Sequence, residues 1–225
     1  MMPIGDDNSA RMTTPVVTMA LIVINVIAFL FEVMQPNPES FIRTWGTIPA
    51  ELTRGEDLET LLTSMFLHGG WAHLFGNMLF LWTFGDNVED AFGHGPYLVF
   101  YLVCGLAAAV AQALLGPNST IPAVGASGAI SGVMAAYIVK FGSNRVRVLM
   151  GRAITAVPAY FMIGLWIVLQ FINGFASIAN TSETGGVAYG AHIGGFIAGL
   201  ILTFLLRGFA RPQVASAQST RSQLR

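Results

Sequence analysis

The stretch VGASGAISGV, Val124–Val133, places two serines and three glycines inside a run that is otherwise apolar enough to be buried in a membrane. Gly128 and Gly132 have the four-residue spacing that lets two helix backbones approach closely within a bilayer. A polar group in hydrocarbon is costly unless it is paired. The stretch therefore predicts a tight helix interface that holds a polar side chain.

The rest of the chain has the composition of a membrane protein. Of 225 residues, 54% are hydrophobic and 10% are charged, against about 25% charged in an ordinary soluble domain. Each apolar run is near the roughly 20 residues that cross a bilayer as a helix. We predict an all-α membrane protein with six transmembrane helices, at residues 16–34, 61–84, 96–115, 122–141, 154–173 and 186–206.

The distribution of Lys and Arg predicts the orientation, because cytoplasmic loops are enriched in both. With the N-terminus inside, the cytoplasmic stretches hold nine such residues and the outer loops hold two, Arg43 and Arg54. The expected cytoplasmic loop at 85–95 has none. Both termini are expected in the cytoplasm. We expect a short N-terminal segment (1–15), one membrane domain (16–206) and a polar, disordered tail (207–225).

Neutral polar residues inside the predicted spans indicate where chemistry occurs. His73 and Asn77 are four residues apart and share one helix face. Ser127 and His192 lie on helices that both run from outside to inside, so they are expected at similar depth. Glycines at four-residue spacing in both helices favour close contact. Ser127 would lie in the first turn of its helix, where unpaired N–H groups favour negative charge.

Less specific interpretations remain for each of these residues. A serine in a membrane helix is usually bonded to its own backbone, and Ser131 fits that description. His192 is equally explained as an interhelical hydrogen bond. His73 and Asn77 lack a nearby carboxylate or cysteine for a metal site. A transporter or metal channel is disfavoured because buried acids and internal repeats are lacking, and the single Cys104 allows no intrachain disulfide.

Three segments, in this order, resemble the rhomboid intramembrane serine proteases: HGGWAHLFGN (68–77), GASG (125–128) and AHIGGFIAG (191–199). The resemblance extends over nearly the whole chain and implies a six-helix rhomboid-like bundle. It implies Ser127 as the nucleophile and His192 as its base. His73, Asn77 and the Ser127 backbone N–H resemble the oxyanion-stabilising groups. Structural roles near the site are implied for His68, Gly125, Gly128 and Gly195.

The same resemblance implies an intramembrane serine endopeptidase that cleaves single-span membrane proteins near the outer membrane face through an acyl-enzyme. No cofactor, metal or nucleic acid is expected, and the partners are the substrate and the lipid bilayer. The expected location is the plasma membrane, as a multi-pass protein of a bacterial inner membrane. The alternative within the same fold is a non-catalytic protein that binds membrane helices.

Access of water and substrate is expected near the fifth span. Hydrolysis needs water, which would enter from the outer side through a mobile loop at 174–186. The span itself, with Pro158, Phe161, Leu165 and Trp166, is the expected gate for a substrate helix.

Two positions differ from the rhomboid pattern. The region EDLETLLTS (56–64) stands where members often have a Trp-Arg pair, so the preceding loop must be anchored differently. Ser131 stands where some members have a tyrosine that stacks on the catalytic histidine. What supports the His192 ring is left open. Neither change removes a reacting group.

Overall fold

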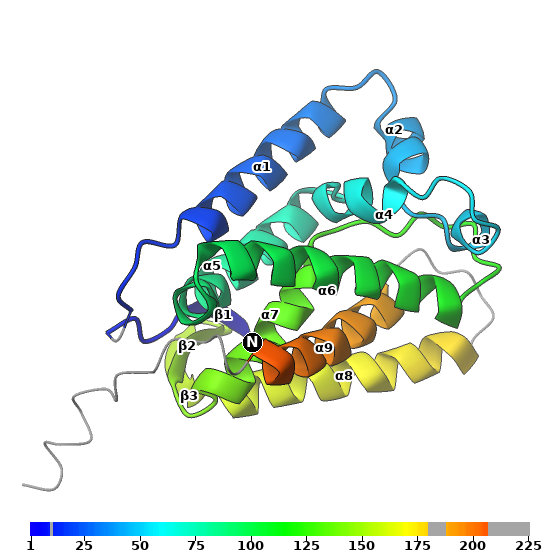
Figure 1. Ribbon diagram of the computed structural model, residues 1–225. Coiled ribbons are helices and arrows are strands. Elements are labelled where there is room, and N and C mark those ends of the chain that lie inside the picture. The colour runs from blue at the N-terminus through cyan, green and yellow to red at the C-terminus, as the bar shows by residue number, and fades with distance from the viewer. Residues whose placement is uncertain (10, 180–187, 207–225) are drawn as a thin grey trace, which may run out of the picture.

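Long helices form a bundle with a small sheet at one end in the computed structural model, which describes residues 1–9, 11–179 and 188–206 (Figure 1). The long helices are α1 (Val16–Val33), α5 (Trp71–Phe92), α6 (His94–Leu115), α7 (Ser127–Phe141), α8 (Ala159–Ala179) and α9 (Tyr189–Leu205). Four short helical turns connect α1 to α5: α2 (Pro38–Trp45), α3 (Pro49–Leu52), α4 (Thr60–Thr63) and the 3₁₀ turn η1 (Ser64–Phe66). The strands are β1 (Met2–Gly5), β2 (Arg145–Met150) and β3 (Ala153–Pro158).

Apolar helices occupy the predicted spans, although their lengths differ. Among the described residues, α1 and α6 are long and apolar enough to cross a bilayer. Helices α7 and α9 and the Ala159–Gly174 part of α8 are shorter apolar segments. Helix α5 is long, but it carries Asp86, Glu89 and Asp90 near its end.

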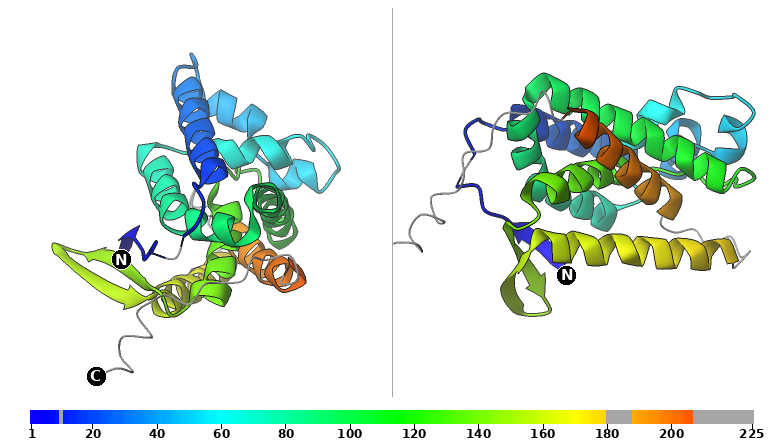
Figure 2. Two further views of the ribbon diagram at one scale, coloured as in Figure 1. Left: turned by 60° about the vertical axis from the view of Figure 1, so that its left-hand side comes forward. Right: turned by 60° about the horizontal axis from the view of Figure 1, so that its bottom comes forward.

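Helix α7 lies inside the bundle, with α5, α6, α8 and α9 around it (Figure 2). Every residue from Gly128 to Tyr137 is buried. A Cβ on Gly195 of α9 would overlap the carbonyl oxygen of Gly128, and one on Gly199 would overlap the backbone of Gly132. These pairs bring α7 and α9 into backbone contact, as the glycine spacing predicts.

Several predicted span limits are wrong. The span expected at 61–84 is α5, which begins ten residues later, after the extended turn at Gly69 and Gly70, and continues to Phe92. The loop expected at 85–95 is therefore helical, and only Gly93 separates α5 from α6. Gly93 has φ +81°, a conformation that favours glycine. The spans expected from 122 and 154 begin as helices at Ser127 and Ala159.

The expectation of an all-α protein is wrong at one end of the bundle, where β1, β2 and β3 form an antiparallel sheet in that order. The sequence RVRVLM of β2 alternates charged and apolar residues, which suits a strand with one buried face. Val146 and Val148 are fully buried. Pro158, expected in the fifth span, belongs to β3.

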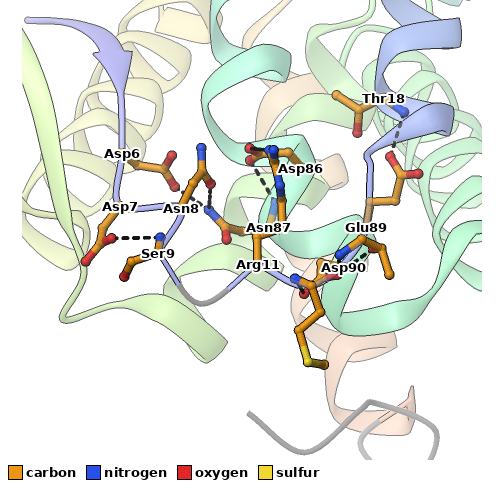
Figure 3. Close-up of polar contacts among 12 residues, drawn as sticks. Asp6, Asp7, Asn8, Ser9, Arg11, Thr18, Asp86, Asn87, Glu89 and Asp90 are labelled. Carbon is orange, nitrogen blue, oxygen red and sulfur yellow. Dashed lines mark hydrogen bonds and ion pairs between the residues drawn. The ribbon is translucent and has the colours of Figure 1, made fainter. Parts of the chain in front are cut away.

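The N-terminal segment binds the end of α5 through a dense set of hydrogen bonds, shown in Figure 3. Arg11 Nη1 lies 2.7 Å from Asp86 Oδ2. Glu89 accepts the backbone N–H groups of Val17 and Thr18 at 2.8 and 2.7 Å, at the start of α1. We call this set, residues 6–9 and 11–18 with residues 86–90 and His94, the polar clamp. It satisfies the acids that would otherwise be costly at the end of an apolar helix.

Asp6 lies in the polar clamp and accepts hydrogen bonds from Tyr137 Oη and Asn87 Nδ2, each at 2.6 Å. Burial raises the pKa of the Asp6 carboxyl to about 6, and the nearby Asp86 adds to the rise. The two hydrogen bonds act in the opposite direction. The carboxyl therefore titrates at a higher pH than an ordinary aspartate.

The predicted tail at 207–225 and residues 180–186 of the predicted mobile loop lie outside the described residues. Residues 174–179 of that loop belong to helix α8.

Candidate active site

Ser127 and His192 meet where α7 and α9 come into contact. The Oγ atom of Ser127 lies 2.8 Å from Nε2 of His192, which is hydrogen-bond distance. Ser127 is partly exposed, whereas His192 is buried. A hydroxyl bonded to an imidazole nitrogen is the pairing that activates a serine for nucleophilic attack.

The start of α7 determines the environment of the hydroxyl. Ser127 is the first residue of the helix, so its backbone N–H has no acceptor within the helix. The partial positive charge at a helix N-terminus stabilises a nearby anion. Ser127 therefore presents its hydroxyl and a backbone N–H of the helix N-terminus at the same point.

His73 and Asn77, in the first turns of α5, lie beside Gly125 in the turn that leads to Ser127. Gly69 N–H donates to His73 Nδ1 at 3.3 Å, which leaves the ring hydrogen on Nε2. Asn77 is buried, and its Nδ2 has no hydrogen-bond partner among the described residues. Both side chains contact Gly125, two residues before Ser127. Two donors thus border the turn that leads to the hydroxyl.

Gly125 fixes that turn. Its φ of +123° favours glycine, and a Cβ there would lie 2.8 Å from Cε1 and Nε2 of His73. Its N–H donates to the carbonyl oxygen of Ser64 at 2.9 Å. Nearby, Thr47 and Ala123 exchange two backbone hydrogen bonds. These hydrogen bonds attach the long loop between α1 and α5 to the segment before Ser127. They anchor the loop without a Trp-Arg pair.

His68 lies next to His73. It is fully buried, its ring is 5.2 Å from that of His73, and its two ring nitrogens have no partner in the described part of the chain. Its backbone N–H donates to Glu32 Oε2 at 3.0 Å. Glu32 of α1 is itself buried.

Comparison with known proteins identifies the family. Residues 55–209, more than half of the chain, match the family described as Rhomboid domain. The chain belongs to the rhomboid family. It is therefore a multi-pass helical membrane protein of a family of intramembrane serine proteases, and the resemblance seen in the sequence is confirmed.

Several curated rhomboid relatives are similar over most of the chain. Rhomboid protease GluP of Bacillus subtilis (strain 168) is 32% identical over 84% of this chain and 35% of its own length. RHOMBOID-like protein 5 of Arabidopsis thaliana is 30% identical over 76% of this chain and 51% of its own length. Rhomboid protease AarA of Providencia stuartii is 30% identical, over 83% and 70% respectively. The chain thus spans about a third to a half of the first two relatives.

Ser131 occupies the rhomboid position where a tyrosine can support the histidine. It is fully buried, and its Oγ donates to the carbonyl oxygen of Ser127 at 2.6 Å. This is the backbone-bonded arrangement expected for a serine in a membrane helix. The Ser131 hydroxyl is therefore directed to the backbone of α7.

Two residues near His192 were missed by the sequence analysis. Gln170 Oε1 lies 2.8 Å from His192 Nδ1, and the Trp166 ring lies 5.6 Å from the imidazole ring at an angle of 39°. Gln170 stands alone as an amide in the apolar run FMIGLWIVLQFI (161–172), which was an available signal. Trp166 was assigned to the gate. By contrast, the side chains of Phe161 and Leu165 on α8 are exposed at the surface of the protein.

In the described part of the chain, no group of three or more His, Cys, Asp or Glu side chains is arranged to hold a metal ion. The site geometry is that of a hydroxyl, an imidazole and neutral hydrogen-bond donors. This is the chemistry of acyl transfer.

Proposed function

We propose that this rhomboid protein is an intramembrane serine endopeptidase in which Ser127 and His192 form the catalytic dyad. The observation that carries the proposal is the 2.8 Å separation of Ser127 Oγ and His192 Nε2 at the N-terminus of α7. The rhomboid proteases among its relatives support the same activity.

In the first half of the reaction, His192 Nε2 takes the Ser127 hydroxyl proton while Oγ attacks the carbonyl carbon of the scissile peptide bond. The carbonyl oxygen becomes an oxyanion. His192 then gives the proton to the leaving nitrogen, and the C–N bond breaks. An ester between Ser127 and the N-terminal part of the substrate remains.

In the second half, a water molecule attacks the ester carbonyl and gives its proton to His192. Collapse of the second tetrahedral intermediate breaks the bond to Oγ and returns the proton to Ser127. The products are a new carboxyl terminus and a new amino terminus. His192 serves as base and acid in both halves, so no other titrating group is needed.

The oxyanion is stabilised by three donors: His73 Nε2–H, Asn77 Nδ2–H and the Ser127 backbone N–H. All three lie around the turn at Gly125. Donors that are already oriented stabilise the developing charge without reorganisation, and each is typically worth about 10²–10³ in rate. His68, Gly125, Gly128 and Gly195 hold these groups in place.

The membrane orientation is part of the proposal. Helices α1, α5, α6, α7, α8 and α9 would cross the bilayer, with residues 1–15 and the tail at 207–225 on the cytoplasmic side of a 16–206 protease domain. The excess of nine Lys and Arg residues over two supports this orientation. Ser127 and His192, at the N-terminal halves of α7 and α9, then lie near the outer face. A bacterial plasma membrane is the proposed location.

The proposed substrate is a single-span membrane helix that unwinds near its outer end. A helical backbone hides the scissile carbonyl in its own hydrogen bonds, so local helix breakers and small residues should mark the cleavage site. Helix α8 is the proposed gate. Its exposed Phe161 and Leu165 would contact lipid or the incoming helix, and their replacement by alanine is expected to change the rate of cleavage.

The test is cleavage of tagged single-span proteins by the purified protein in lipid vesicles. Wild type is expected to cleave, Ser127→Ala to give no product, and the matched variant Ser131→Ala to remain active. Product from a folded Ser127→Ala protein would exclude this nucleophile. Binding of substrate helices by the wild type without cleavage would instead identify a non-catalytic helix-binding protein.

A further inference from the structure

We propose that Gln170 is the positioning residue of the catalytic base: its side-chain oxygen accepts the Nδ1–H of His192 and thereby completes a hydrogen-bonded chain Ser127–His192–Gln170. This rests on the proposed function of Ser127 and His192. It adds a third member, from α8, to a site otherwise assembled from α5, α7 and α9.

The geometry of the imidazole carries the inference. Nε2 lies 2.8 Å from Ser127 Oγ, and Nδ1 lies 2.8 Å from Gln170 Oε1. An oxygen acceptor at Nδ1 requires the ring hydrogen there and leaves the lone pair on Nε2, where the serine proton must go. Both ring nitrogens are therefore engaged, which fixes the rotation of the ring as well as its tautomer.

Burial makes the interaction specific. Gln170 is 9% exposed and His192 is 8% exposed. An amide within an apolar membrane helix is costly when unpaired, and in α8 it is directed to the side-chain nitrogen of His192. A glutamine that only joins helices is also present: Gln112 of α6 accepts the backbone N–H of Ala191, one residue before His192, at 3.1 Å. The two glutamines thus bind neighbouring residues of α9 but different kinds of atoms.

Trp166 supports the same ring from the same helix face. It lies one turn before Gln170 on α8, and its ring is 5.6 Å from that of His192 at an interplanar angle of 39°. Ser131, in the position of a supporting tyrosine, binds the backbone of α7. Helix α8 therefore provides the support for the imidazole that α7 lacks. His192 is aligned on Ser127 only while α8 lies against α9.

The first test measures how fast a fluorophosphonate labels the purified protein. Gln170→Leu keeps the side-chain volume but removes the acceptor. It is expected to slow labelling about tenfold, a change near the upper end of the free energy that one hydrogen bond contributes. Gln170→Glu retains an acceptor oxygen and is expected to restore most of the rate. Gln112→Leu, the matched control, is expected to slow labelling less than about threefold. Equal rates for Gln170→Leu and wild type, or equal losses in both Leu variants, would overturn the assignment.

The second test reads the tautomer directly, and its decisive readout is the wild-type protein. In ¹⁵N-histidine NMR spectra at neutral pH, the His192 signal, identified by its loss in His192→Asn, is expected to report a protonated Nδ1 and an unprotonated Nε2. Gln170→Leu is expected to give a mixture of tautomers, and Gln112→Leu is not. A wild-type His192 protonated on Nε2 would contradict the proposal even if Gln170→Leu failed to fold.

The two proposals fail separately. If wild type is not labelled, or if Ser127→Ala is labelled equally, the proposed dyad is wrong. If Ser127-dependent labelling is normal but insensitive to Gln170→Leu, only the role of Gln170 is wrong.

Discussion

Helix α5 carries one buried asparagine near each end, and the two differ in what they bind. Asn87, in the polar clamp, donates through Nδ2 to Asp6 Oδ2 at 2.6 Å and to Asn8 Oδ1 at 2.8 Å. Asn77, ten residues earlier, has no partner for its Nδ2 among the residues described. Both side chains are less than a tenth exposed.

The difference separates polar groups that are paired within the fold from a polar group that is left unpaired. In the polar clamp, the carboxylates of Asp86, Glu89 and Asp90 each accept hydrogen bonds from the N-terminal segment or from the start of α1. Near Ser127, a buried donor is left without an acceptor, which typically costs about 1–3 kcal/mol. Such a cost is tolerated where an acceptor appears during function. The oxyanion that we propose at Ser127 would be such an acceptor.

The asparagine pair gives the largest predicted contrast. Asn77→Ala is expected to lower kcat about 10²–10³-fold, because one oxyanion donor is lost, with little change in the unfolding temperature. Asn87→Ala is expected to lower the free energy of unfolding by about 1–3 kcal/mol, because it leaves buried acceptors unpaired, and to spare kcat in the folded protein. Substrate cleavage and thermal unfolding of both variants measure the contrast. Equal rate losses in the two would remove the distinction between the two ends of α5.

The next largest effect is expected at Glu89. Its side chain is fully buried, accepts two N–H groups at the start of α1 and lies 2.6 Å from His94 Nδ1. Glu89→Ala leaves these donors unpaired and is expected to cost about 2–3 kcal/mol of unfolding free energy. Glu89→Gln keeps one acceptor oxygen and is expected to cost less. Denaturant titration in detergent measures both, and unchanged stability in Glu89→Ala would show that the polar clamp does not hold α1.

The smallest effect is a pH dependence at Asp6. Its pKa is about 6 in the folded protein, above the ordinary 3.8, so the folded state binds more protons between these values. The free energy of unfolding is therefore expected to fall as pH rises from 4 to 6 and then to level off. The raised pKa corresponds to at most about 3 kcal/mol, and partial exposure reduces this to about 1–2 kcal/mol.

Asp6→Asn tests this pH dependence, because the amide does not titrate. The variant is expected to have a flatter stability profile between pH 4 and 6, measured as the unfolding midpoint at each pH. A slope as steep as that of wild type would assign the pH dependence to another group.

The sequence alone predicted that Ser127 and His192 lie close together. Glycines at 128, 132, 195 and 199 predicted the α7–α9 contact through their spacing, and that contact sets the depth and proximity of Ser127 and His192. The spacing of His73 and Asn77 predicted that they share one helix face. Each of these inferences depends on periodicity within one helix, which a sequence displays directly.

The remaining features depend on contacts between distant segments. Helix α5 continues through the acidic stretch at 86–90 because residues more than 70 positions earlier satisfy those acids. The β2–β3 hairpin lies next to an apolar helix, and its pairing with β1 joins the chain's start to residues 147–149. The proposed role of Gln170 depends on its contact with His192, 22 residues later. No local pattern predicts which partners such residues find.

The most direct test of the central claim is to locate the covalent adduct formed by a serine-reactive fluorophosphonate. Peptide mass spectrometry of the labelled wild-type protein is predicted to find a single modified residue, Ser127, and none in a folded His192→Ala protein. Modification of another residue, or undiminished modification of Ser127 without the imidazole of His192, would contradict the account.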